Sequence, residues 1–167
     1  RGRPPSSTPF PYTTVFRSAT GRNEGWRLLC DGASLDGWAS TGSADGWATE
    51  DGTIVCTVSD GGYLYTEEQF EDYCLAVDFK INPGCNSGIF FMWSDLDDPV
   101  NTGLEIQILD TYGPDRTGVH DCGAVYELVP PKKSTMKPAG YWNRSEEPLS
   151  ESQPQAYLPC PLLLVYN

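Results

Sequence analysis

The sequence predicts an all-β protein, built as a two-layer antiparallel β-sandwich or jelly roll. Between residues 23 and 143, short segments rich in aromatic and β-branched residues alternate with turns rich in Gly, Asp, Asn and Pro. No amphipathic helix pattern of about 10 to 15 residues lies between these segments, as a parallel βαβ sheet would require. The six or seven short strands therefore favour a sandwich over a parallel sheet.

The clearest predicted strand covers residues 73–81, where apolar side chains alternate with small or charged ones. One face of this strand is expected to contact a core, and the other is not. Shorter strands are expected, in chain order, at residues 26–30, 47–50, 53–58, 88–93, 104–109 and 124–128. Turn sequences such as Asp51-Gly52 and Asn82-Pro83-Gly84 separate them, and at most one helical turn is expected, near residues 67–70.

The chain is acidic, with 11 Lys and Arg against 23 Asp and Glu among its 167 residues, a net charge of −12. This balance disfavours nucleic acid and anionic membrane surfaces as partners. No apolar run approaches the ~18 residues of a membrane-spanning helix, so no membrane span is expected. The first residues also contain no apolar run like that of a secretion signal.

The two ends of the chain differ from its middle. Residues 1–22 contain four arginines and no acidic residue, and their Pro, Ser and Thr content predicts disorder. Residues 8–18 also resemble the translation of a sequencing adaptor, and residues 144–147 resemble the start of the opposite adaptor. We therefore expect a partial natural domain at 23–143, between a disordered or artefactual arm at 1–22 and an artefactual tail at 144–167. No strand is expected after Asn143, and the alternative is a natural arm and an unusual tail.

The cysteines give no metal-binding pattern, because no C-x-x-C pair occurs and the chain has a single His. A structural zinc site is therefore not expected, although a divalent metal elsewhere is left open. Three cysteines lie in apolar strands and are expected as small buried residues: Cys30, Cys56 and Cys74. Cys85 and Cys122 lie in Gly-flanked loops, where either a disulfide or free thiols would fit.

Residues 104–109 carry the most informative pattern. Leu104, Ile106 and Ile108 are expected to face the core, which leaves Glu105 and Gln107 on the opposite face, about 6.6 Å apart along the strand. A carboxylate beside an amide on a sheet surface suits sugar recognition or proton transfer. The alternative is an ordinary solvated outer face.

A second cluster surrounds the single histidine. Histidine is the residue type that can switch charge near neutral pH, and His120 is followed by Asp121, so a general base, a metal ligand and a surface loop residue are all open. Residues 94–99 are acidic but lack the ligand spacing of an EF-hand, which favours a solvated loop. Three tryptophans near glycine turns are expected to fill the core rather than stack on sugars: Trp26, Trp38 and Trp47.

Seven motifs follow one another through the middle of the chain: GWRLLCDGASLDGW (25–38), GWATEDGTIVC (46–56), GGYLYTEEQFEDYCLAVDFKI (61–81), GCNSGIFF (84–91), TGLEIQILDTYG (102–113), GVHDCGAVY (118–126) and KPAGYWN (137–143). In this order they resemble the 3-keto-disaccharide hydrolase domain family. The resemblance implies a concanavalin A-like jelly roll in an exported bacterial protein, periplasmic or extracellular, with an oxidised carbohydrate as its partner. It also implies cleavage of glycosides whose C3 hydroxyl has become a ketone.

The resemblance implies a site built from eight residues. The catalytic candidates are Glu105, His120 and Asp110, of which Glu105 or His120 would be the base. The substrate-binding candidates are Asn86, Gln107, Asp121, Tyr126 and Lys133, and Lys133 would stabilise an enolate. No cofactor is implied with certainty.

Two features depart from the family pattern. Tyr141 stands where an acidic residue is common, and the strands that normally follow Trp142-Asn143 are missing. A non-catalytic carbohydrate-binding module and an inactive fragment are therefore the alternatives to an enzyme.

Overall fold

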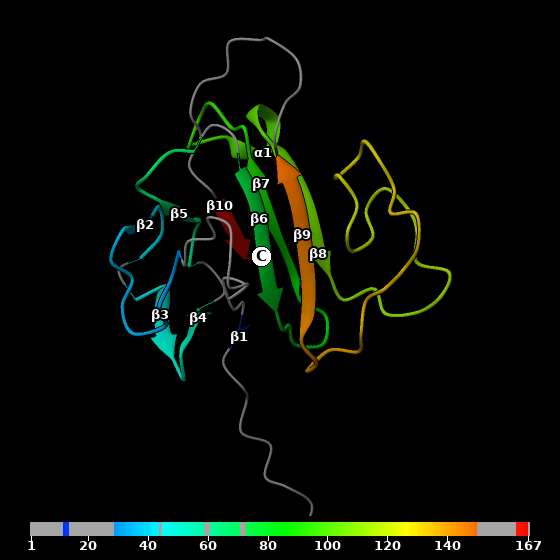
Figure 1. Cartoon of the computed structure of the whole chain (residues 1–167), viewed down its shortest axis with the longest axis horizontal. Coiled ribbons are helices and arrows are strands. Elements are labelled where there is room, and N and C mark those ends of the chain that lie inside the picture. Colours follow the sequence, from blue (N-terminus) through cyan, green and yellow to red (C-terminus); the bar gives the residue numbers. More distant parts are fainter. Residues whose placement is uncertain are drawn as a thin grey trace, which may run out of the picture.

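The computed structural model describes residues 12–13, 29–43, 45–58, 61–70, 73–149 and 163–166. Among these residues it contains ten strands and one short helix (Figure 1). The elements are β1 (Tyr12–Thr13), β2 (Trp38–Ser40), β3 (Trp47–Glu50), β4 (Thr53–Cys56), β5 (Leu64–Thr66), β6 (Tyr73–Phe79), β7 (Asn86–Phe91), α1 (Pro99–Thr102), β8 (Leu104–Leu109), β9 (Asn143–Leu149) and β10 (Leu163–Tyr166).

The strands form three sheets, and every pairing between them is antiparallel. The largest sheet has the order β2-β5-β10-β7-β8. The other two are the pair β6-β9 and the three strands β1-β4-β3. In Figure 1, β6 and β9 lie across the β7-β8 part of the large sheet, while β3 and β4 lie at its other end.

One apolar core joins these sheets into two layers. The large sheet contributes alternate residues of three strands, including Leu64, Ile89 and Ile108, each 1% exposed or less. The facing layer contributes Val77 from β6 and Ile54 from β4, both with 0% exposure. Side chains of two sheets that interdigitate over one core define a β-sandwich, so the predicted all-β sandwich is confirmed.

The strongest sequence patterns gave the right strands. β3 and β8 have the predicted bounds, and β4, β6 and β7 differ from the predicted ranges by two residues at one or both ends. In β6 the expected alternation holds, because Leu75, Val77 and Phe79 are buried in the core while Asp78 is only half-buried. Hydrophobic period alone therefore located the central strands.

Other expectations were wrong. Residues 124–128 form turns instead of a strand, with isolated bridges from Val125 to Ile106 and to Val129. Residues 67–70, where at most one helical turn was expected, contain a bend at 67–68 and no helix. Leu29 and Cys30 are not in a strand, and residues 26–28 lie outside the described residues. The sequence also missed β2 and β5, which have three residues each, too few to show a period.

The expectation of no strand after Asn143 was also wrong. β9 begins at Asn143 and pairs with the whole of β6, and β10 pairs with both β5 and β7. The sequence of β9 is polar, yet its backbone pairs with the whole length of the strongly apolar strand β6. Strand pairing needs backbone groups rather than apolar side chains, which is why composition gave no sign of this strand.

The tryptophan and cysteine expectations can be compared where side chains are described. Trp38 and Trp47 are core residues, and their indole N–H groups donate to the carbonyl oxygens of Leu29 (2.8 Å) and Gly61 (3.0 Å). Cys30 and Cys56 are buried, as predicted, whereas the side chains of Cys74 and Cys160 and the residue Trp26 lie outside the described part. Cys85 and Cys122 are free thiols.

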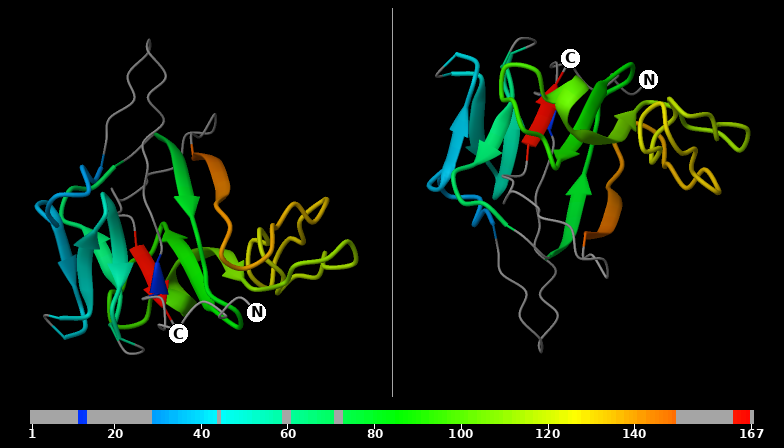
Figure 2. Two further views of the ribbon diagram at one scale, coloured as in Figure 1. Left: turned by 90° about the horizontal axis from the view of Figure 1, so that it is seen from below. Right: turned by 90° about the horizontal axis from the view of Figure 1, so that it is seen from above.

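A long loop between β8 and β9, residues 110–142, projects beside the sheets and is drawn in yellow tones in Figures 1 and 2. Its first part returns to the edge of β8, where the amide of Gln107 donates to Ala124 (2.9 Å) and the amide of Gly123 donates to Gln107 (2.8 Å). Within the described residues, no helix has the length and apolar character needed to cross a bilayer.

Candidate active site

Three of the predicted site residues, Asn86, Glu105 and Gln107, lie on the face of the large sheet that points away from the shared core. In the β7-β8 pair, Gly88 stands opposite Gln107 and Phe90 stands opposite Glu105. Directly opposed residues of antiparallel strands point to the same side of the sheet. We call this surface, made by Asn86, Gly88, Phe90, Glu105 and Gln107, the Glu105 face. Ile106 and Ile108 point the other way, into the core.

The carboxyl group of Glu105 lies across Gly88 on the neighbouring strand. A methyl group built on Gly88 would collide with Oε1 of Glu105 and come within 2.7 Å of its Cδ. A glycine inside a strand commonly marks such a close approach. The Asn86-Ser87-Gly88 motif therefore provides the space in which the carboxyl group rests.

Burial raises the pKa of Glu105 from its ordinary value of 4.5 to about 7. The physical cause is desolvation, which disfavours the charged carboxylate. A group with a pKa near 7 exists at neutral pH partly as the acid and partly as the base, as proton transfer in both directions requires. The alternative of a solvated outer face is therefore wrong for this position.

Gln107 is buried, with 4% exposure, and its Oε1 accepts no hydrogen bond within the described part of the chain. Leaving a buried acceptor unpaired costs about 1–3 kcal/mol, so such a group is often explained by water or a ligand. A sugar hydroxyl would supply the missing donor.

Tyr126 lies on the same side of the sheet as Glu105. Its amide donates to the carbonyl oxygen of Glu105 (2.9 Å), and the neighbouring Val125 forms an antiparallel bridge with Ile106. The register of this bridge places Tyr126 opposite Glu105. The ring of His120 contacts that of Tyr126, with 5.0 Å between centroids, and His120 Nε2 lies 3.7 Å from Oε1 of Glu127.

The remaining predicted residues have other surroundings. Oδ2 of Asp110 accepts the amide of Gly84 (2.8 Å), so this carboxylate holds the turn between β6 and β7. Oδ2 of Asp121 accepts the amide of Gly118 (2.7 Å) inside the long loop. Lys133 is exposed on the same loop. The structure thus places Asn86, Glu105 and Gln107 on one face of the sheet, with Tyr126 opposite Glu105 and His120 against Tyr126.

An aromatic cluster that the sequence analysis missed also lies on this side of the sheet. Phe90, which is 1% exposed, packs against Tyr63, Tyr65, Trp93 and Leu96. Tyr63 meets Phe90 edge-on with 6.3 Å between ring centroids, and Tyr65 meets Trp93 at the same distance. The alternation of Tyr63, Leu64 and Tyr65 was the signal for this cluster, but the segment is too short to have been identified as a strand.

Metal binding has no cluster to support it in the described residues, where no group of three or more His, Cys, Asp or Glu side chains could hold an ion. The acidic segment 94–99 instead forms internal bonds. Asp95 accepts the amide of Asp97 (2.9 Å), and Asp98 accepts the side-chain amide of Asn101 (2.8 Å) just before and within α1.

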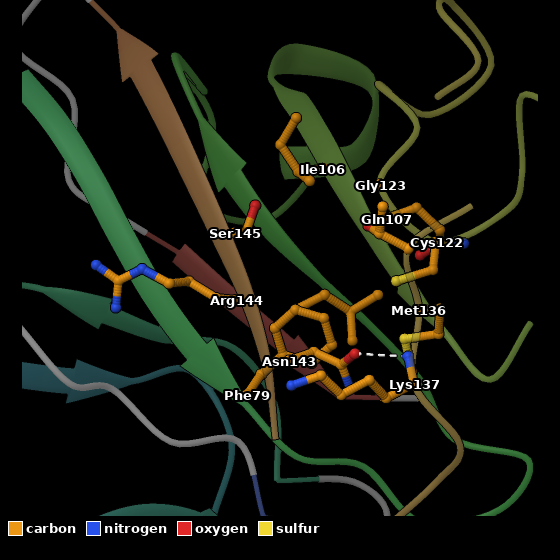
Figure 3. Close-up of a pocket in the computed structure, with 12 residues that line it drawn as sticks. Phe79, Ile106, Gln107, Cys122, Gly123, Met136, Lys137, Asn143, Arg144 and Ser145 are labelled. Carbon is orange, nitrogen blue, oxygen red and sulfur yellow. Dashed lines mark hydrogen bonds between the residues drawn. The ribbon is translucent and has the colours of Figure 1, made fainter. Parts of the chain in front are cut away.

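A pocket of about 250 Å³ lies between the edges of β8 and β9 (Figure 3). Core residues such as Phe79 and Ile106 line it, together with Gln107 and loop residues such as Met136. At its rim Oδ1 of Asn143 accepts the amide of Lys137 (2.8 Å), the dashed line in Figure 3, and its Nδ2 donates to Tyr141 (3.1 Å). Asn143 therefore clips the end of the loop to the start of β9.

A family model described as a 3-keto-alpha-glucoside-1,2-lyase-like domain matches residues 25–146. A 3-keto-disaccharide hydrolase of Bacteroides thetaiotaomicron is 27% identical over 150 residues, 74% of this chain and 52% of that protein. The chain thus spans about half the length of this curated relative.

Solved structures of Parabacteroides distasonis proteins, described as proposed glycosyl hydrolases, share the fold. One has a TM-score of 0.65 and 25% identity, covering 80% of this chain and 68% of that one. Another has a TM-score of 0.63 and 20% identity, covering 86% and 91%.

Proposed function

The chain belongs to the 3-keto-alpha-glucoside-1,2-lyase-like domain family, and we propose that it cleaves 3-keto-glycosides, with Glu105 as the group that transfers the proton. The general activity is that of the 3-keto-disaccharide hydrolase relative. The observation that carries the assignment to Glu105 is its desolvated carboxyl group, which lies over Gly88 with a pKa near 7.

The proposed chemistry begins at C2 of the sugar, where the adjacent C3 ketone makes the C–H bond acidic. The carboxylate of Glu105 takes the C2 proton, the electrons move toward the ketone, and the bond from C1 to the leaving oxygen then breaks. The product of this step is a 1,2-unsaturated 3-keto sugar. Water adds to C1, and Glu105 returns a proton to C2, so that the net reaction is hydrolysis.

Binding of the sugar falls to the neighbours of Glu105 on the same face. The unpaired Oε1 of Gln107 would accept a sugar hydroxyl, and the side-chain amide of Asn86 would bind another hydroxyl or the C3 carbonyl. Tyr126 would contact the sugar ring beside Glu105. These roles are supported by the shared face rather than by any bound ligand.

His120 is the less supported base. It contacts the ring of Tyr126 and the carboxylate of Glu127, and its side chain is 58% exposed. A positioning role, in which His120 holds Tyr126 beside Glu105, fits these contacts better than proton transfer from C2. Enolate stabilisation by Lys133, and ligand contacts by Asp110 and Asp121, stay predictions.

The wider setting is also part of the proposal. An oxidised carbohydrate as partner and a periplasmic or extracellular location are inferred from the family. The concanavalin A-like jelly-roll order of the strands is a further inference from the same source.

Aglycone release from a 3-keto-glucoside tests the proposal. We expect the chain to release p-nitrophenol from p-nitrophenyl 3-keto-α-glucoside, and Glu105→Gln to lower turnover at least about 100-fold. Glu50→Gln, which changes an exposed carboxylate of β3, is the matched control and should leave turnover unchanged. Saturable binding of the 3-keto-glucoside without release by the unaltered chain would identify a carbohydrate-binding module instead.

A further inference from the structure

We propose that Tyr63 is a second catalytic residue, the phenol that protonates the leaving oxygen when the bond to C1 breaks. This inference rests on the proposed function, and it adds the acid that the Glu105 mechanism leaves unassigned. A sugar that leaves as an alkoxide is a poor leaving group unless it receives a proton as the bond breaks.

The strand pattern places Tyr63 on the same side of the large sheet as Glu105. Leu64, which follows it, is 1% exposed and packs in the shared core. Neighbouring residues of an extended chain point to opposite sides, so Tyr63 points away from that core. Its ring packs edge-on against Phe90, the residue directly opposite Glu105 in the β7-β8 pair. Phe90 therefore contacts Tyr63 through its ring and stands opposite Glu105 in the strand register.

Two hydrogen bonds to Thr41 hold the backbone of Tyr63 in place. Its amide donates to Oγ1 of Thr41 (2.9 Å), and its carbonyl oxygen accepts the amide of Thr41 (3.0 Å). The preceding Gly62 has a φ of 70°, and a side chain there would collide with the backbone of Gly42. A catalytic group needs support of this kind, because small displacements reduce its efficiency.

The electrostatic environment keeps the phenol protonated. Burial raises the pKa of Tyr63 above its ordinary value of 10.0, and the nearby charges of Glu105 and Asp98 raise it further. A protonated phenol can donate, so at neutral pH Tyr63 is an acid while the carboxylate form of Glu105 is a base. The pKa values of Tyr63 and Glu105 are well separated on the same face of the sheet, so Tyr63 is assigned as the acid and Glu105 as the base.

The proposed step balances in both directions. As Glu105 takes the C2 proton and the C1–O bond breaks, the Tyr63 O–H proton passes to the leaving oxygen, which departs as an alcohol. The Tyr63 phenolate then takes a proton from the water that attacks C1. Glu105 exchanges its proton with solvent while the unsaturated sugar is bound and then protonates C2, so both residues end in their starting forms.

The test compares two leaving groups in Tyr63→Phe, which keeps the ring and its packing on Phe90. p-Nitrophenolate leaves without protonation, whereas the alcohol released from a 3-keto-disaccharide needs a proton. The rate compared is release of the leaving group in the first turnover, which precedes the addition of water. We expect Tyr63→Phe to lower this rate at least about 100-fold for the disaccharide and less than about 5-fold for the aryl glucoside. Tyr65→Phe, two residues along on the same side, is the control and should leave the ratio of the two rates unchanged.

Equal rates in Tyr63→Phe and the unaltered chain on both substrates, or equal losses on both, would overturn the proposal for Tyr63. If Tyr63→Phe unfolds at the same temperature as the unaltered chain, a loss of turnover comes from the missing hydroxyl group and not from unfolding. Failure of the proposed function is distinguishable, because the unaltered chain would then release neither leaving group.

Discussion

The carboxyl group of Glu105 occupies the space beside Gly88 that any side chain at position 88 would fill. The partner strand thus determines where the carboxyl group rests, and burial there brings its pKa to about 7. The relationship links a glycine in β7 to the chemistry proposed for β8.

Gly88→Ala is expected to displace the Glu105 carboxyl group, because the added methyl group needs the same volume. We expect turnover of p-nitrophenyl 3-keto-α-glucoside to fall at least about 10-fold and the free energy of unfolding to fall by about 1–3 kcal/mol. The control is Gly118→Ala in an exposed turn, where the nearest atom to a new methyl group is the flexible carboxylate of Asp121 at 3.2 Å. Full activity of Gly88→Ala would contradict the account.

The stability of the chain should depend on pH through Glu105. The folded state holds this proton more tightly than the unfolded chain, so the free energy of unfolding falls as pH rises from about 4.5 to about 7. Glu105→Gln removes the cost of the buried charge. Allowing for partial exposure of the group, we expect this variant to be about 1–2 kcal/mol more stable at pH 8 and no more stable at pH 4, as measured by urea unfolding.

Activity should follow the opposite trend in pH. The carboxylate form of Glu105 is the proposed base, so kcat/KM for the aryl glucoside should rise with pH and level off above about 7. The aryl substrate isolates this group, because its leaving oxygen needs no acid. A rise in kcat/KM centred near pH 4.5, the ordinary range of a solvated carboxylate, would show that a group other than Glu105 is titrating.

Tyr126→Ala should weaken substrate binding more than it slows the chemical step. The backbone of Tyr126 is bonded to that of Glu105, and its ring contacts the ring of His120. We expect KM to rise about 10-fold, equivalent to about 1.4 kcal/mol, with kcat changed less than about 3-fold. Tyr112→Ala, which removes a tyrosine that is 61% exposed, is the control. An unchanged KM in Tyr126→Ala would remove this residue from the binding set.

Much of the fold was predictable because the central strands carry their own period. The alternation in β8 correctly separated Ile106 and Ile108 from Glu105 and Gln107. The depth at which Gln107 is buried was not predictable, because an alternating strand reveals one apolar side and not what covers the other. Tyr63 was missed for a similar reason, since β5 has only three residues and its place depends on distant strands.

Gly88 could have been identified from the sequence, since a glycine within a strand pattern commonly marks a close approach. The turn roles of Asp110 and Asp121 could not, because their partners are backbone amides that only the folded chain brings within reach. Loop carboxylates near a sequence motif look the same in sequence whether they hold a turn or a ligand.

The central claim is that Glu105 transfers the proton at C2, and deuterium incorporation at that carbon tests it most directly. The reaction is run in D2O with a 3-keto-glucoside, and the sugar product is analysed at C2 against a control without protein. The account predicts enzyme-dependent deuterium at C2 with the unaltered chain, and loss of both cleavage and incorporation in Glu105→Gln. Cleavage that leaves C2 unlabelled and proceeds undiminished in Glu105→Gln would contradict it.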